Sequence, residues 1–199
     1  MTEGLPMLAT TPTTVLEAVN AIIATIGEPP VSSVEDNGVL DAVMALQALS
    51  AVNRQVQLKG WHWNTETNYP IASTYPEGEL RVPKNTLRIA PSRDFAHLDL
   101  VLRGDRLYNR KEHTFQIGQS IKTDVVFLLP FEELPEAART YITIKAGRRF
   151  NEGQIGSDLL STFSQRDEME ARFALEDAEG ETSNLNILGH EFIQEVSFR

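Results

Sequence analysis

The chain has 199 residues, 41% of them hydrophobic, which is enough for one large or two small domains with real cores. Its 28 acidic and 18 basic residues give a net charge of −10, which argues against tight binding of DNA over the whole surface. The lack of cysteine excludes disulfides and thiolate metal sites, and the longest apolar run, Val125 to Leu129, is too short to span a membrane.

The N-terminal third is predicted to be helical. Residues 1–13 show no periodicity and no targeting pattern, so we expect an arm. Thr14 and Glu17 fit a capping box, and the apolar spacing that follows predicts a helix ended by Gly27. The prolines at 29 and 30 then predict an extended connector over residues 28–38.

A long second helix follows, because apolar residues at spacings of three and four mark one buried face. These residues are Leu40, Val43, Met44, Leu46, Leu49, Val52 and Val56. Gly60 is a stop signal, and Trp61 and Trp63 alternate around His62 as in a strand. We expect the two tryptophans to form a core anchor where the helical part meets the next part.

Short strand signals fill most of the chain from there to residue 130. One predicted hairpin pairs Leu80 and Val82 with Leu87 and Ile89. A second runs from residues 98–102 through the turn at Gly104 into residues 107–108, and a last strand covers residues 121–129. We expect five or six antiparallel strands inserted between helices.

Helical patterns return at Pro135, a favourable first residue for a helix that runs to Phe150. Residues 151–156 are expected to be a loop. The last helix is predicted to start at Ser157 or Asp158 and to reach Asn184, with an i, i+4 pair between Glu168 and Arg172. Its predicted buried face consists of Leu160, Phe163, Ala171, Ala174, Leu175 and Ala178.

These patterns predict an α+β fold with three regions. Residues 1–61 supply an arm and helices, residues 62–130 an inserted antiparallel β module, and residues 131–199 further helices and a tail. The helices of the first and last regions are expected to form a four-helix bundle.

We predict no catalytic, cofactor-binding or metal-binding residues, because the four histidines are isolated and no nucleotide-binding glycine pattern occurs. One alternative is a glycan hydrolase that uses a carboxylate pair, Glu77 with Glu79 or Asp94 with Asp99. Another is a cell-surface binding module on the triplet from Arg103 to Asp105, although a glycine turn is the stronger interpretation of that triplet.

Two groups of motifs point to a known family. The first comprises Ala18 to Ile23, Ile26 to Ser32, Asn53 to Gln57, and Gly60 with Trp61. The second comprises Leu134 to Glu136, Arg148 to Asn151, Asp167 with Glu168, and Ala171 with Arg172. Together they resemble the tail tubular protein A family of short-tailed bacteriophages.

The resemblance implies a structural virion protein, the head-to-tail adaptor, assembled in the host cytoplasm and located in the virion tail. It implies a ring of twelve copies below the portal protein and above the tail nozzle protein, near the tail fibre, with DNA crossing the lumen without specific binding. Twelve copies at −10 each give −120, a charge that repels DNA.

The interface residues we predict lie near the C-terminus. Glu176 and Asp177, with the arm before Thr14, are expected to meet neighbouring copies. The tail residues Phe192, Val196 and Phe198 are expected to meet the portal protein.

Overall fold

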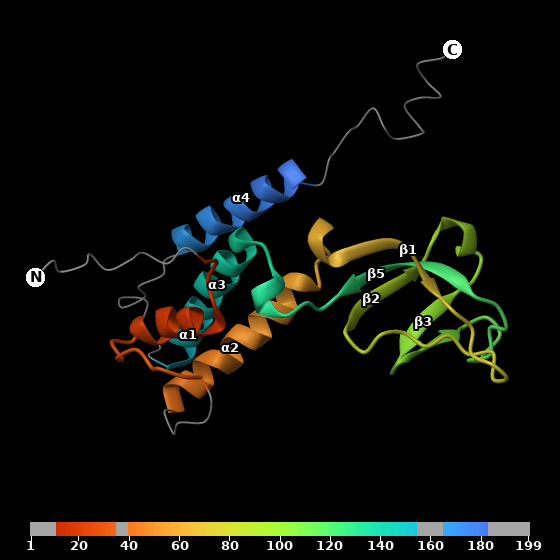
Figure 1. Cartoon of the computed structure of the whole chain (residues 1–199), viewed down its shortest axis with the longest axis horizontal. Coiled ribbons are helices and arrows are strands. Elements are labelled where there is room, and N and C mark those ends of the chain that lie inside the picture. The colour runs from red at the N-terminus through yellow and green to blue at the C-terminus, as the bar shows by residue number, and fades with distance from the viewer. Residues whose placement is uncertain (1–10, 35–39, 155–164, 183–199) are drawn as a thin grey trace, which may run out of the picture.

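The computed structural model describes residues 11–34, 40–154 and 165–182. In it the chain is α+β, as predicted, with helices gathered at one end and strands at the other (Figure 1). The chain leaves the helical end after α2 (Leu40–Gln57), forms every strand found in the described residues, and returns to the helical end. We call the two ends the helical part and the β module.

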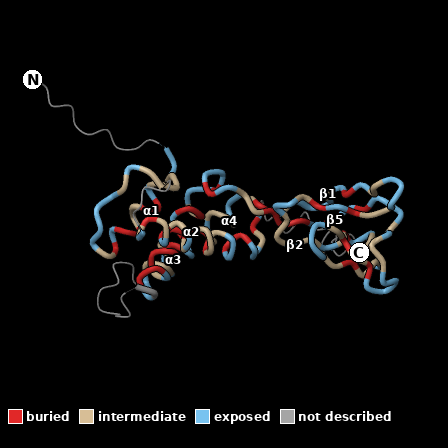
Figure 2. The backbone as a smooth tube through the Cα atoms, turned by 90° about the horizontal axis from the view of Figure 1, so that it is seen from below, coloured by how far each residue is buried: buried red, intermediate tan, exposed pale blue. Residues whose placement is uncertain are grey.

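The helical part contains α1 (Val15–Ala24), α2 (Leu40–Gln57), α3 (Glu136–Gln154) and α4 (Gln165–Thr182). Helix α3 contacts each of the other three, and α1 also packs on α2. One hydrophobic core joins them, formed by buried residues such as Ile22, Val52, Ile142 and Leu175. Figure 2 shows buried residues on the inward side of these helices and a separate group among the strands.

The capping box that opens α1 is confirmed. The Thr14 hydroxyl accepts from the Glu17 amide, while the Glu17 carboxylate accepts from the Thr14 amide at 2.7 Å. These bonds lower the pKa of Glu17, with the Thr14 backbone as the largest cause. A second anchor comes from Arg139, whose buried guanidinium donates to the carbonyls of Thr13, Glu132 and Leu134.

The predicted face of α2 is partly wrong. Leu40 is 69% exposed and Met44 37% exposed, whereas Ala42 and Ala45 are buried together with Leu49, Val52 and Val56. The contact with α1 and α3 selects small residues where the helices approach closely, and a pattern of large apolar residues misses them. Gln57, expected on the polar side, is also fully buried.

The last two helices differ from prediction as well. Helix α3 continues through Gln154, so the loop expected from Asn151 is wrong at its start; buried Asn151 accepts a hydrogen bond from Thr25 at 2.7 Å. On α4, Ala171 and Leu175 are buried as expected but Ala174 is exposed. The predicted helix start at Ser157 or Asp158, with Leu160 and Phe163, lies outside the described residues.

The β module holds two antiparallel sheets. In the three-stranded sheet β5 (Ile121–Phe127) lies between β1 (Thr65–Ile71) and β2 (Thr86–Pro91). The two-stranded sheet pairs β3 (Leu100–Arg103) with β4 (Arg106–Asn109) across Gly104, so the second predicted hairpin is confirmed. A small core between the sheets is formed by Ile71, Leu80, Val82, Leu100, Leu107 and Ile121.

The first predicted hairpin is wrong. Leu80 and Arg81 form isolated bridges with Ser73 and Arg106, while β2 pairs with β5. Residues 80 and 82 are buried in the module core, which explains their alternation. Such a pattern identifies an extended buried segment but does not identify its partner.

Gly60 sits where α2 gives way to the β module and has a φ of +79°. A Cβ there would lie 3.1 Å from Val126 Cγ2 and 3.3 Å from Thr65 Oγ1, and would displace the Arg88 guanidinium. Gly104 has a similar φ of +65° but open space around its Cβ position. The two glycines therefore separate backbone strain from crowding.

We expect Gly60→Ala to lower the free energy of unfolding by about 2–3 kcal/mol and Gly104→Ala by about 1 kcal/mol, because only the first adds a steric conflict to the strained backbone. Urea denaturation followed by circular dichroism measures both. Equal losses in the two variants would show that the surroundings of Gly60 are not tightly packed.

Candidate assembly surface at the junction and the last helix

Two chain segments cross side by side between the helical part and the β module, and polar side chains hold them together. The Gln57 amide donates to the Leu129 carbonyl at 2.9 Å and accepts from the Leu129 amide at 2.8 Å. The Asn64 amide donates to the carbonyls of Gln57 and Phe127, both at 2.9 Å. Gln57 and Asn64 are both buried, so the bonds are shielded from water.

Trp61 closes the helical core at this junction. Its ring is 6% exposed, its Nε1–H donates to the Val56 carbonyl at 2.8 Å, and it stacks on Trp63 with centroids 6.3 Å apart. The predicted core anchor is therefore confirmed for Trp61. The predicted strand alternation is wrong: residues 62–64 form a short 3-10 helix, because Asn64 accepts from the Trp61 amide and turns the chain.

Helix α4 lies across the junction and is tied to it by charges. Glu176 Oε1 contacts Lys59 Nζ at 3.1 Å and Arg172 Nε at 3.0 Å. These bonds lower the pKa of Glu176, with Arg172 as the larger cause and Lys59 as the second. Glu179 accepts from the His62 amide.

The ion pair predicted between Glu168 and Arg172 does not form. Glu168 turns toward α3, where it pairs with Arg148 and lies 3.9 Å from Lys145. Arg172 instead pairs with Glu176 one turn further along α4. Both partners of the predicted pair thus serve contacts that fix α4 in place.

The outward face of α4 is apolar. Met169 and Phe173, one turn apart, are 50% and 62% exposed, on the side opposite buried Ala171 and Leu175. Acidic residues border this face, and Phe173 lies beside Glu176 and Asp177 in a shallow depression. We call Met169, Phe173 and Asp177 the α4 outer face.

The structure describes two of the residues predicted to form interfaces, Glu176 and Asp177. Asp177 is exposed on the α4 outer face, while Glu176 contacts Lys59 and Arg172 of its own chain. Phe192, Val196 and Phe198 lie outside the described residues. Met169 and Phe173 were missed, although their i, i+4 spacing off the buried face was a usable signal.

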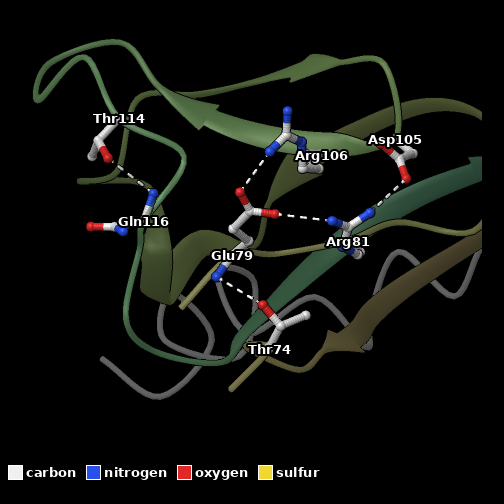
Figure 3. A network of polar contacts seen from close by, with 7 residues as sticks. All are labelled: Thr74, Glu79, Arg81, Asp105, Arg106, Thr114 and Gln116. Carbon is white, nitrogen blue, oxygen red and sulfur yellow. Dashed lines mark hydrogen bonds and ion pairs between the residues drawn. The ribbon is translucent and has the colours of Figure 1, made fainter. Parts of the chain in front are cut away.

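An ion-pair network engages Glu79, one of the residues considered for glycan cleavage (Figure 3). Glu79 Oε1 contacts Arg106 at 2.6 Å and Oε2 contacts Arg81 at 3.3 Å. Because both carboxylate oxygens are engaged by arginines, Glu79 is arranged as a structural link between chain segments. Asp99, from the other carboxylate pair, lies 3.7 Å from Arg110.

The turn at Gly104 holds its charged neighbours against the β module. Asp105 contacts Arg81 at 3.1 Å, as Figure 3 shows, and the Arg103 guanidinium lies 3.7 Å from the Tyr108 ring centroid. Gly104 has the positive φ that such a turn requires. These contacts favour the structural interpretation of this triplet.

Over residues 11–34, 40–154 and 165–182, no three His, Cys, Asp or Glu side chains are grouped so that they could hold a metal ion. None of the four described helices is long and apolar enough to cross a membrane.

An exposed apolar face with an acidic border, as on the last described helix, is typical of the class of proteins that act through contacts with other polypeptides. The family model described as tail tubular protein matches residues 16–185. The chain therefore belongs to the tail tubular protein family, a family of phage tail structural proteins. No curated protein sequence matches it.

Proposed function

We propose that this protein is the head-to-tail adaptor of a short-tailed phage. Twelve copies form a ring between the portal protein and the tail nozzle protein, with the tail fibre nearby, and DNA passes through the lumen. Membership of the tail tubular protein family supports a position in the virion tail. The protein is assembled into the virion in the host cytoplasm.

The observation that carries this proposal is the α4 outer face. Phe173 is 62% exposed and Met169 is 50% exposed, and both lie on α4. The two side chains together expose a large apolar surface to water. In a closed ring each copy meets its neighbours through two unlike surfaces, so one such face per copy is sufficient. The occupant we propose is the next copy of the same chain.

The charge distribution supports that choice. Residues 62–130 carry nine basic and eight acidic residues, so the remaining residues, with nine basic and 20 acidic, hold the acidic excess. The β module of a neighbouring copy therefore offers cations to the acidic border of the α4 outer face. The acidic excess of the assembled ring repels DNA, which allows passage without specific binding.

The proposed work is mechanical rather than chemical. The four helices act as a bundle that forms the rigid body of each copy, and the β module extends from it as a second contact surface. The arginine pairs on Glu79 support a structural role for this carboxylate, one of those considered for glycan cleavage.

The test mixes purified protein with its cognate portal and nozzle proteins and measures complex formation by mass photometry and electron microscopy. We expect twelve copies in a ring between the two partners. We expect Phe173→Asp to weaken ring formation at least tenfold, because it places a charge in the proposed contact without disturbing a buried site.

Leu40→Asp is the matched control, since Leu40 is 69% exposed at the start of α2 and belongs neither to the α4 outer face nor to the β module. If wild-type protein fails to join portal and nozzle, the adaptor function is wrong. If wild-type protein joins them and Phe173→Asp does so equally well, the function stands but the α4 outer face is not the contact.

A further inference from the structure

A small cavity lies between α2, α3 and α4 at the junction. Its volume is about 200 Å³, and its lining includes Lys59, Lys145 and Arg172 together with the rings of Trp61 and Tyr141. No acidic side chain is among the described residues that line it. At about 30 Å³ per water molecule, the cavity has room for a small anion with a few waters.

Positive charge is concentrated here although the whole chain is acidic. The ion pairs around the cavity use four cations and three carboxylates, which are Lys59, Lys145, Arg148 and Arg172 with Glu152, Glu168 and Glu176. Glu152 contacts only Arg148 among these cations and its side chain is 68% exposed. The cavity itself is therefore surrounded by more positive than negative charge.

Two of the cations that line the cavity contact the same carboxylate oxygen. Lys59 Nζ and Arg172 Nε both contact the single oxygen Glu176 Oε1, so the two nitrogens lie no farther apart than the sum of those two short distances. The Glu176 carboxylate supplies one negative charge between these two positive charges, so one positive charge remains to attract a second anion. Guanidinium and ammonium groups also provide more donors than one carboxylate oxygen can accept.

Two aromatic rings position the lysine ammonium groups beside the cavity. Lys59 Nζ lies 4.3 Å from the Trp61 ring centroid, and Lys145 Nζ lies 5.5 Å from that of Tyr141. Lys145 also donates to the Tyr141 hydroxyl at 3.3 Å, so this oxygen acts as the acceptor and its own O–H can donate to a ligand. The rings thus hold the two ammonium groups against the cavity and leave a phenolic donor beside them.

We propose that this cavity is a binding site for a small oxyanion, a carboxylate or a phosphate, held by Lys59, Lys145 and Arg172. The proposal goes beyond the adaptor function and does not depend on ring formation. The oxyanion comes either from a free solute or from an acidic side chain of another polypeptide. Both sources present the same chemistry to the three cations.

The test titrates the full chain with sodium phosphate against sodium chloride at matched ionic strength. Trp61 lines the cavity and Trp63 stacks on it, so intrinsic tryptophan fluorescence reports occupancy. We expect a saturable change with phosphate and none with chloride. Arg172→Gln is expected to weaken phosphate binding at least tenfold.

Arg166→Gln is the matched control because Arg166 forms the same i, i+4 pair on α4, with Glu170, but does not line the cavity. Lys145→Gln gives a second variant that leaves the ties of Glu176 to Lys59 and Arg172 intact. Circular dichroism establishes that each variant is folded. An unsaturable phosphate response, or equal affinities in Arg172→Gln and Arg166→Gln, overturns the proposal.

An acetylated tetraglutamate peptide, added in competition with phosphate, distinguishes the two sources. Displacement of phosphate by the peptide assigns the site to carboxylates of another polypeptide. Saturable phosphate binding without displacement assigns it to a free anion. Either result supports an oxyanion site, whereas failure of both probes to bind rules it out.

Discussion

Replacing Trp61 with alanine is expected to lower the free energy of unfolding by about 3–5 kcal/mol, the range for removing a large buried aromatic side chain. Trp61 is 6% exposed and belongs to the helical core. The change also removes the Nε1–H donor of the Val56 carbonyl and the stacking partner of Trp63. Urea denaturation followed by circular dichroism measures the loss without relying on tryptophan emission.

Phe173→Ala is the matched control, because it also removes an aromatic ring but from a side chain that is 62% exposed. We expect it to change the free energy of unfolding by less than about 0.5 kcal/mol. If Trp61→Ala is as mild as this control, the junction is not held by the tryptophan.

Replacing Gln57 with leucine is expected to cost about 2–4 kcal/mol, because two main-chain groups of Leu129 lose their partners in a buried setting. Leucine is close to glutamine in size, so the change tests hydrogen bonding more than packing. The Asn64 amide also donates to the Gln57 carbonyl at 2.9 Å, and that bond is kept. Thermal unfolding by circular dichroism gives the midpoint shift.

Gln47→Leu on the exposed side of α2 is the control, with an expected change within about 0.5 kcal/mol. Hydrogen exchange of the Leu129 amide adds a local readout, since this amide donates to Gln57 Oε1 at 2.8 Å. We expect faster exchange in Gln57→Leu only. Unchanged protection there would mean that Gln57 does not hold the two segments together.

Local signals in the sequence predicted most of the helices. The Thr14 and Glu17 capping box depends on residues three apart, and the turn at Gly104 depends on adjacent residues, so both were readable from the chain alone. The face of α2 was partly misjudged because Ala42 and Ala45 are buried by the approach of other helices. No property of those alanines indicates that approach.

Strand pairing was harder to predict from the sequence, because it also depends on segments that are distant in the chain. The buried alternation of Leu80 and Val82 was correctly seen as extended chain, but their partners come from distant segments. β5 lies between β1 and β2 in the sheet, although it follows both of them in the chain. No short turn links β5 to either partner, so local sequence does not specify this order. Gln57 illustrates the limit most clearly, because a polar residue on a helix is normally exposed and here it is bonded to Leu129.

The candidate site was predicted in outline. The acidic last helix was identified, and Asp177 lies on its exposed face, but Met169 and Phe173 were not singled out. Charges alone did not reveal which partner each would choose, so Arg172 was paired with Glu168 rather than Glu176. The choice depends on the position of Lys59, which the fold brings to α4 from more than a hundred residues away in sequence.

The β module begins and ends at neighbouring positions, since Thr65 at the start of β1 pairs with Val126 near the end of β5. A segment whose two ends meet in this way can be exchanged for another of different size without moving the helices that receive it. The β module is therefore a replaceable cassette, provided that the incoming segment keeps the partners of Gln57 and Asn64.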